Sequence, residues 1–92
     1  MINQEIIDAM QAERARQLSL QHSGKFLYTC SDYQLSLSDK LTILTEEIGE
    51  VARAVLEATA LTKTQGRSPS IVFVKKELIQ VMAVCHAWLE SL

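Results

Sequence analysis

The sequence has few of the residues that β-sheets and their turns require. Aromatic residues make up 5% of the 92-residue chain, which contains one proline and three glycines. Sheet proteins use aromatic and β-branched residues in strands, and glycine and proline in turns. The composition therefore favours an all-α fold, and the length allows one domain, residues 1–92.

The sequence is also poor in cysteine, and it lacks long apolar runs. Cys30 and Cys85 lie far apart and form no CxxC pair, which argues against a disulfide framework or a structural zinc site. The opening MINQEIIDAM lacks the apolar core of a signal peptide. No apolar run is long enough to span a membrane. We expect a cytoplasmic protein with reduced thiols and no membrane contact.

Positive charge is not in excess either. The net charge is −2 and the isoelectric point is about 5.6, so nothing indicates a nucleic-acid-binding surface. Hydrophobic residues nevertheless make up 48% of a chain too short to bury a large core, and the mean hydropathy is +0.08. We therefore expect a partner subunit to cover apolar surface, in a homodimer or a homotetramer.

Apolar periodicity predicts three helices separated by two breaks. The first covers residues 2–21, the second runs from Ser36 or Ser38 to about Lys63, and the third runs from about Pro69 to the C-terminus. Ser38 is a plausible N-cap, and Pro69 suits a first helical position. The connection at residues 22–35, HSGKFLYTCSDYQL, is apolar enough to be packed down or to cover something, and it has room for a short helical turn.

The second predicted helix carries several carboxylates beside an apolar face. The stretch TEEIGEVARAVLEA, residues 45–58, contains Glu46, Glu47, Glu50 and Glu57. Three of them cluster together, while Glu47 lies between the cluster and an apolar face, which consists of Leu41, Leu44, Ile48, Val51 and Val55. Like charges at these spacings repel, and only Arg53 is placed to offset them. Taken alone, this helix favours a solvated acidic face.

The third predicted helix changes that balance. Glu77 falls within its main apolar face, which consists of Phe73, Val74, Leu78, Val81, Val84, Cys85 and Trp88. Burying a lone carboxylate is costly, so Glu77 requires a partner. A divalent cation shared with Glu47 and Glu50 would meet this need; the alternatives are an Arg53–Glu77 ion pair or a protonated Glu77. Because this helix is apolar nearly all round, we expect it at the centre of a bundle or at an interface.

The string EEIGE, followed about thirty residues later by ELIQ, resembles the EExxE…ExxD pattern of the MazG-like all-α nucleoside triphosphate pyrophosphohydrolases. The resemblance covers most of residues 37–92, including LTEEIGEVA and the apolar helix that ends in AWLE. It implies that Glu47, Glu50 and Glu77 are metal ligands and that Glu46 orients the attacking water. Gln80 stands where the family has its closing Asp, and it offers a neutral carbonyl oxygen instead.

The resemblance implies a Mg²⁺-dependent hydrolase, with Mn²⁺ as a substitute, that converts nucleoside triphosphates to monophosphates and pyrophosphate in nucleotide house-cleaning. Lys40 and Arg53 are candidates for phosphate contacts and Trp88 for base stacking, although surface positions for the cations and core packing for Trp88 are the simpler interpretations. Glu13 and Gln17 are interpreted as a stripe edge near solvent. The alternative is a non-catalytic helical oligomer that binds nucleotide or a protein partner, because Gln80 replaces an acidic ligand.

Overall fold

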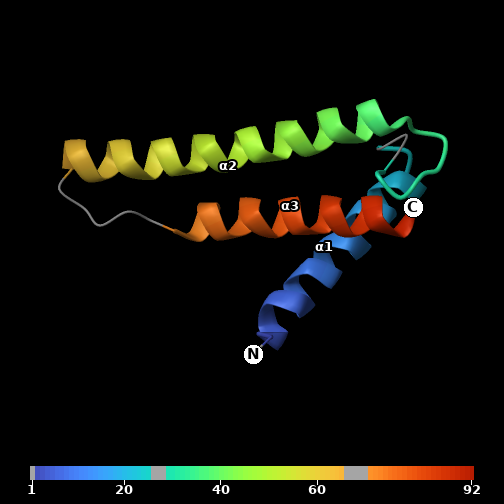
Figure 1. Ribbon diagram of the computed structural model, residues 1–92. Coiled ribbons are helices and arrows are strands. Elements are labelled where there is room, and N and C mark those ends of the chain that lie inside the picture. The colour runs from blue at the N-terminus through green and yellow to red at the C-terminus, as the bar shows by residue number, and fades with distance from the viewer. Residues whose placement is uncertain (1, 26–28, 66–70) are drawn as a thin grey trace.

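The computed structural model describes residues 2–25, 29–65 and 71–92, with side chains throughout except at residues 61–65. Its elements are α1 (Gln4–His22), α2 (Leu37–Gln65) and α3 (Val72–Glu90), and these ranges contain no strand (Figure 1). The all-α prediction is therefore confirmed. Pro69 and the predicted start of the third helix lie outside the described residues. No described helix combines the length and apolar character that a membrane span requires.

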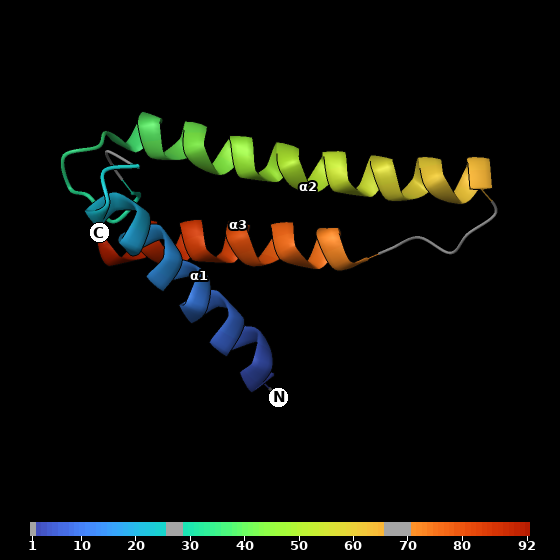
Figure 2. The same ribbon diagram turned by 180° about the vertical axis from the view of Figure 1, so that it is seen from behind.

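The three helices form an antiparallel hairpin with one crossing helix. α2 and α3 run side by side in opposite directions, while α1 crosses α3 and its N-terminal part diverges (Figures 1 and 2). Backbone contacts join α2 to α3 and α1 to α3, and none joins α1 to α2 over the described ranges. α3 is thus the central helix, as its apolar circumference predicts.

Side-chain caps and a glycine set the helix ends. The Asn3 side chain accepts a hydrogen bond from the Ile6 amide at 3.3 Å at the start of α1. Beyond its end, Gly24 adopts a φ of +82°, which glycine tolerates without strain. For α2, Ser36 Oγ accepts from the Asp39 amide at 3.1 Å. Ser38 as the cap is therefore wrong: it lies inside the first turn, and Ser36 holds the position.

The face of α2 that is least exposed differs from the predicted apolar face. It consists of Lys40, Ile43, Leu44, Glu47, Val51, Ala54 and Ala58. Leu41, Ile48 and Val55 are 55%, 53% and 43% exposed, and we call these three residues the outer stripe. The prediction weighted large apolar residues, whereas small alanines allow the closer approach of two helices, so the buried face is rotated and contains Glu47.

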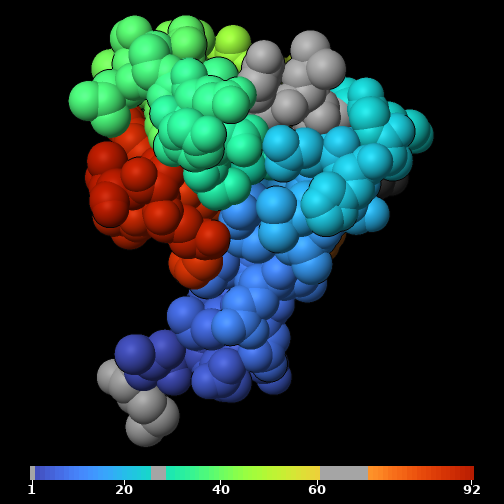
Figure 3. All heavy atoms as spheres, turned by 90° about the vertical axis from the view of Figure 1, so that its right-hand side faces the viewer, coloured from blue at the N-terminus to red at the C-terminus, as the bar shows by residue number. Residues whose placement is uncertain are grey.

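The core lies where α2 begins and α3 ends. Cys30, Val84 and Ala87 are buried, and Ile43, Leu44 and Trp88 pack against them. Phe73 and Leu78, predicted to face the core, are 65% and 47% exposed, since α1 diverges from the first half of α3. The loop after α1 packs down as expected, with Thr29 and Cys30 buried; its described residues form turns and no helix. Figure 3 shows this packed end of the molecule.

Candidate functional site

The structure brings together three of the residues predicted to hold a metal. Glu47 on α2 and Glu77 on α3 are half-buried, whereas Glu46 and Glu50 are exposed. The surrounding groups assign the Gln80 amide an orientation with its NH₂ group toward both carboxylates, because its oxygen would otherwise face only acceptors. In this orientation Nε2 donates to Glu77 Oε2 at 2.9 Å and to Glu47 Oε2 at 3.2 Å. One neutral amide thus bridges the two helices through both carboxylates.

The expected cationic partner of Glu77 is not Arg53. Arg53 Nε lies 3.1 Å from Glu57 Oε1, and both side chains are exposed on α2. The Arg53–Glu77 alternative is therefore wrong, because Arg53 pairs with the carboxylate one turn along its own helix. The Gln80 amide takes the place of a cation beside Glu77.

The carboxylates form a negative cluster that makes no ion pair with a cation among the described side chains. Burial raises the pKa of Glu47 above its ordinary value, and the charges of Glu77, Glu50, Glu13 and Glu46 raise it further. None of the ion pairs formed by the described residues includes Glu46, Glu47, Glu50 or Glu77. Such a cluster attracts a cation or a proton.

The donor chemistry of the cluster fits a hard divalent cation. Carboxylate and amide oxygens are the protein ligands that Mg²⁺ and Mn²⁺ take. Within the described ranges, however, no three His, Cys, Asp or Glu side chains come close enough together to hold a metal. The residues fit in type and in charge, and the metal site stays a prediction.

A cavity of about 240 Å³ adjoins the cluster between the three helices. Glu47 and Ile43 of α2 and Gln80 and Val84 of α3 contribute to its walls. Residues from α1 and the following loop complete the lining: Glu13, Arg16, Gln17, Thr29 and Cys30. Burial raises the pKa of the Cys30 thiol, which favours its neutral form as an apolar wall. The cavity thus places a carboxylate edge beside a half-open, partly apolar space.

The contribution of α1 was not predicted from the sequence. Glu13 was expected near solvent, but its side chain is only 12% exposed, and Arg16 Nη2 donates to it at 2.6 Å. This hydrogen bond raises the pKa of Arg16 above its ordinary value. The buried Arg14 donates from Nη1 to Gln17 Oε1 at 2.9 Å. The segment ERARQ, residues 13–17, could have predicted this contribution, because helical spacing places Glu13, Arg16 and Gln17 on one side of the helix.

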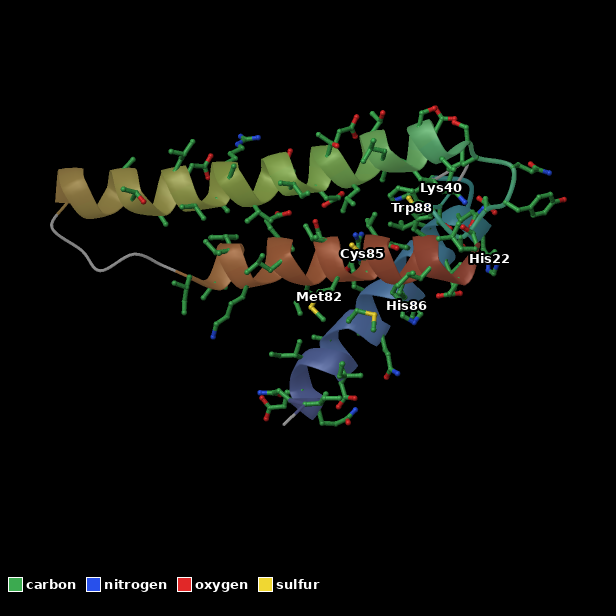
Figure 4. All side chains as sticks on the ribbon, in the orientation of Figure 1. His22, Lys40, Met82, Cys85, His86 and Trp88 are labelled. Carbon is green, nitrogen blue, oxygen red and sulfur yellow. The ribbon has the colours of Figure 1, made fainter. Side chains whose placement is uncertain are left out.

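The predicted substrate-binding residues lie away from this cavity. Lys40 is buried and donates from Nζ to Ser91 Oγ at 2.6 Å, so its interpretation as a surface residue is wrong. Arg53 is exposed, and Trp88 packs against the core cluster, as its simpler interpretation predicted. Lys40 and Trp88 both lie where α2 begins and α3 ends (Figure 4). None of the three lines the cavity, and their contact with a substrate stays a prediction.

Comparisons of the chain with protein-family models, with curated proteins and with solved structures find no match.

Proposed function

We propose that the protein is a Mg²⁺-dependent nucleoside triphosphate pyrophosphohydrolase that releases the monophosphate and pyrophosphate, in nucleotide house-cleaning. The observation that carries the proposal is the contact of Glu47, Glu77 and Gln80 across α2 and α3 beside a half-open cavity. Half-buried carboxylates that form no ion pair with a described side chain are unfavourable for stability alone, so a role in binding cations accounts for them. The sequence resemblance supports the same reaction.

Each residue of the cluster has a distinct role in this proposal. Glu47, Glu50 and Glu77 would hold the cation with their carboxylates, and Gln80 would add its amide oxygen after its amide turns over, since its NH₂ group faces Glu47 and Glu77. The cation would supply charge neutralisation for the phosphates. Glu46, exposed next to Glu47, would orient the water whose oxygen bonds to the α-phosphorus as the bond to pyrophosphate breaks. Phosphate contacts would come from Lys40 or Arg53, and Trp88 would contact the base.

The non-catalytic alternative has one observation in its favour. The Gln80 amide already donates to Glu47 and Glu77, so it satisfies both carboxylates without a metal. A helical oligomer that binds nucleotide or a protein partner would need no more than this. The change Gln80→Asp separates the two proposals. If wild type is inactive and the variant gains turnover, the natural protein is a degenerate enzyme.

We also propose that the protein is a homodimer or a homotetramer, in which a second copy covers the outer stripe of α2. The outer stripe lies on the side of α2 away from Glu46 and Glu50, at about 100° per residue. Its burial would therefore leave the carboxylate cluster accessible. Three large side chains at seven-residue spacing suit the packing of one helix against another.

Pyrophosphate release tests the enzymatic proposal. Wild type is assayed with a panel of ribo- and deoxyribonucleoside triphosphates, with Mg²⁺, with Mn²⁺ and with EDTA. We expect metal-dependent turnover that falls about a hundredfold or more in Glu50→Gln, since a lost electrostatic contact to the transition state has that effect. Glu57→Gln is the matched control, because it removes an exposed carboxylate of the same helix that pairs with Arg53. Absence of turnover with every nucleotide in a folded protein contradicts the proposal.

A further inference from the structure

One side of α2 is exposed and uncharged between residues 37 and 60. The outer stripe lies along its middle, and at about 100° per residue it is extended by further exposed, uncharged residues, namely Leu37, Thr45, Ala52, Leu56 and Thr59. The exposed charged residues of the same range fall on the opposite side of the helix, namely Asp39, Glu46, Glu50, Arg53 and Glu57. We call the first set, together with the outer stripe, the uncharged side of α2.

The two threonines of the uncharged side already satisfy their hydroxyl groups within the helix. Thr45 Oγ1 donates to the Leu41 carbonyl oxygen at 2.8 Å, and Thr59 Oγ1 donates to that of Val55 at 2.9 Å. Burying a hydroxyl is costly only when it loses its hydrogen-bond partner. An apolar surface can therefore cover this side of α2 without leaving either hydroxyl unpaired.

The size and the pattern of this surface fit a second copy of the chain. The protein exposes 6740 Å², on the order of 1,300 Å² more than a monomer of 10.3 kDa, and a standard interface needs ~800 Å² per partner. Ile48 lies seven residues from Leu41 and seven from Val55. A two-fold axis at Ile48 would therefore bring each Leu41 against the Val55 of the other copy, so the surface is complementary to itself.

Two features favour an antiparallel arrangement of the paired helices. Antiparallel α2 helices place the positive end of each helix dipole beside the negative end of the other. The loop at residues 29–36, in which Tyr33 is 84% exposed, lies at the start of α2 (Figure 1). Antiparallel pairing separates the two loops to opposite ends of the dimer, whereas parallel pairing would bring them together at one end.

We propose that two copies of the chain pair through the uncharged sides of their α2 helices, antiparallel and with the two-fold axis at Ile48. Leu41 of each copy packs against Val55 of the other. Glu46 and Glu50 face away from the axis in both copies, so the dimer carries two separate carboxylate clusters. The inference rests on the oligomer of the proposed function and does not depend on the enzymatic activity.

Disulfide cross-linking tests both the direction and the register. Leu41→Cys and Val55→Cys are oxidised separately and after mixing by refolding from urea, and covalent dimer is measured by non-reducing electrophoresis. In the antiparallel pair the two copies of position 41 lie about 21 Å apart along the helices. We expect about tenfold more covalent dimer in the mixture than in either variant alone, because a disulfide needs Cα atoms within ~7 Å. Wild type, which keeps Cys30 and Cys85, gives the background.

A mixture of Leu41→Cys with Glu57→Cys is the matched control, because Glu57 lies two residues from Val55 on the opposite side of α2. Equal cross-linking in this control would indicate random collision and would overturn the inference. Covalent dimer in each variant alone, without a gain on mixing, would show a parallel pair and would also overturn it. A wild-type monomer by light scattering would overturn the pairing and the oligomer together, while pyrophosphate release by that monomer would leave the enzymatic proposal standing.

Discussion

Burial of the Glu47 carboxylate costs stability, whereas its proposed function in cation binding requires the carboxylate. It lies on the buried face of α2, where an apolar residue would pack without electrostatic cost. Burial and the neighbouring carboxylates raise its pKa, so the folded protein holds this proton more tightly than the unfolded chain does. The resulting contribution to stability is fully present below the unfolded pKa and is lost as the pH rises through the folded pKa.

The upward shift of the Glu47 pKa leads to a prediction for the stability of Glu47→Gln. In EDTA at pH 7, we expect a higher free energy of unfolding for the variant than for wild type, because the variant buries no charge. The difference should shrink as the pH falls and be smallest below about pH 3, where the carboxyl is protonated in both states, because the ordinary Glu pKa is about 4.3. Urea denaturation at several pH values and one protein concentration measures it. Glu5→Gln, exposed on α1, should show no such pH-dependent gain; an equal gain there, or a loss in Glu47→Gln, contradicts the explanation.

At the scale of the helices, residue type alone did not identify the N-cap of α2. Two serines precede α2, and both have a helix-start pattern, but only Ser36 accepts the hydrogen bond of the Asp39 amide. Ser38 lies within the first turn, and its hydroxyl contacts that of Ser36 at 3.1 Å. The hydrogen bond, and not the residue type, therefore distinguishes the cap.

Replacing each serine tests this assignment. We expect Ser36→Ala to lower the free energy of unfolding by about 1 kcal/mol, since an unsatisfied amide is left at the helix start. Ser38→Ala, two residues away, should change it by only a few tenths of a kcal/mol, because alanine is a better helix former. Urea denaturation of the two variants beside wild type gives both values. A larger loss in Ser38→Ala would identify Ser38 as the cap.

The helices also show which features of the fold and the site could be predicted from the sequence. Helix periodicity and the EEIGE…ELIQ spacing were enough to predict three helices and to bring Glu47, Glu77 and Gln80 together. They were not enough to predict which face of α2 is buried. The outer stripe is as apolar as a core face, so the count of apolar residues placed it in the core, although it is exposed. Nor did they predict the cavity, because Glu13 and Gln17 line it only through the crossing of α1 over α3, which is a tertiary arrangement.

The whole molecule is more open than a chain of its length should be. Its radius of gyration is 15.1 Å, against about 12 Å for a compact 92-residue protein. It exposes 6740 Å², against about 5,400 Å² for a monomer of 10.3 kDa. The excess, on the order of 1,300 Å², exceeds the ~800 Å² that each partner buries in a standard interface. These two quantities support a partner subunit independently of any resemblance.

The outer stripe offers the sharpest test of that partner. If a second copy packs there, Ile48→Glu places a charge in the centre of the interface, which should shift the protein from an oligomer to a monomer. Light scattering coupled to size-exclusion chromatography measures the mass of each species. Leu89→Glu adds the same charge at a side chain that is 70% exposed near the end of α3, and it should leave the mass unchanged.

If Leu89→Glu alone dissociates the oligomer, the interface lies at the end of the α2–α3 hairpin and not at the outer stripe. A wild-type monomer at micromolar concentration would contradict the oligomer itself, and the exposed apolar surface would then require a different partner.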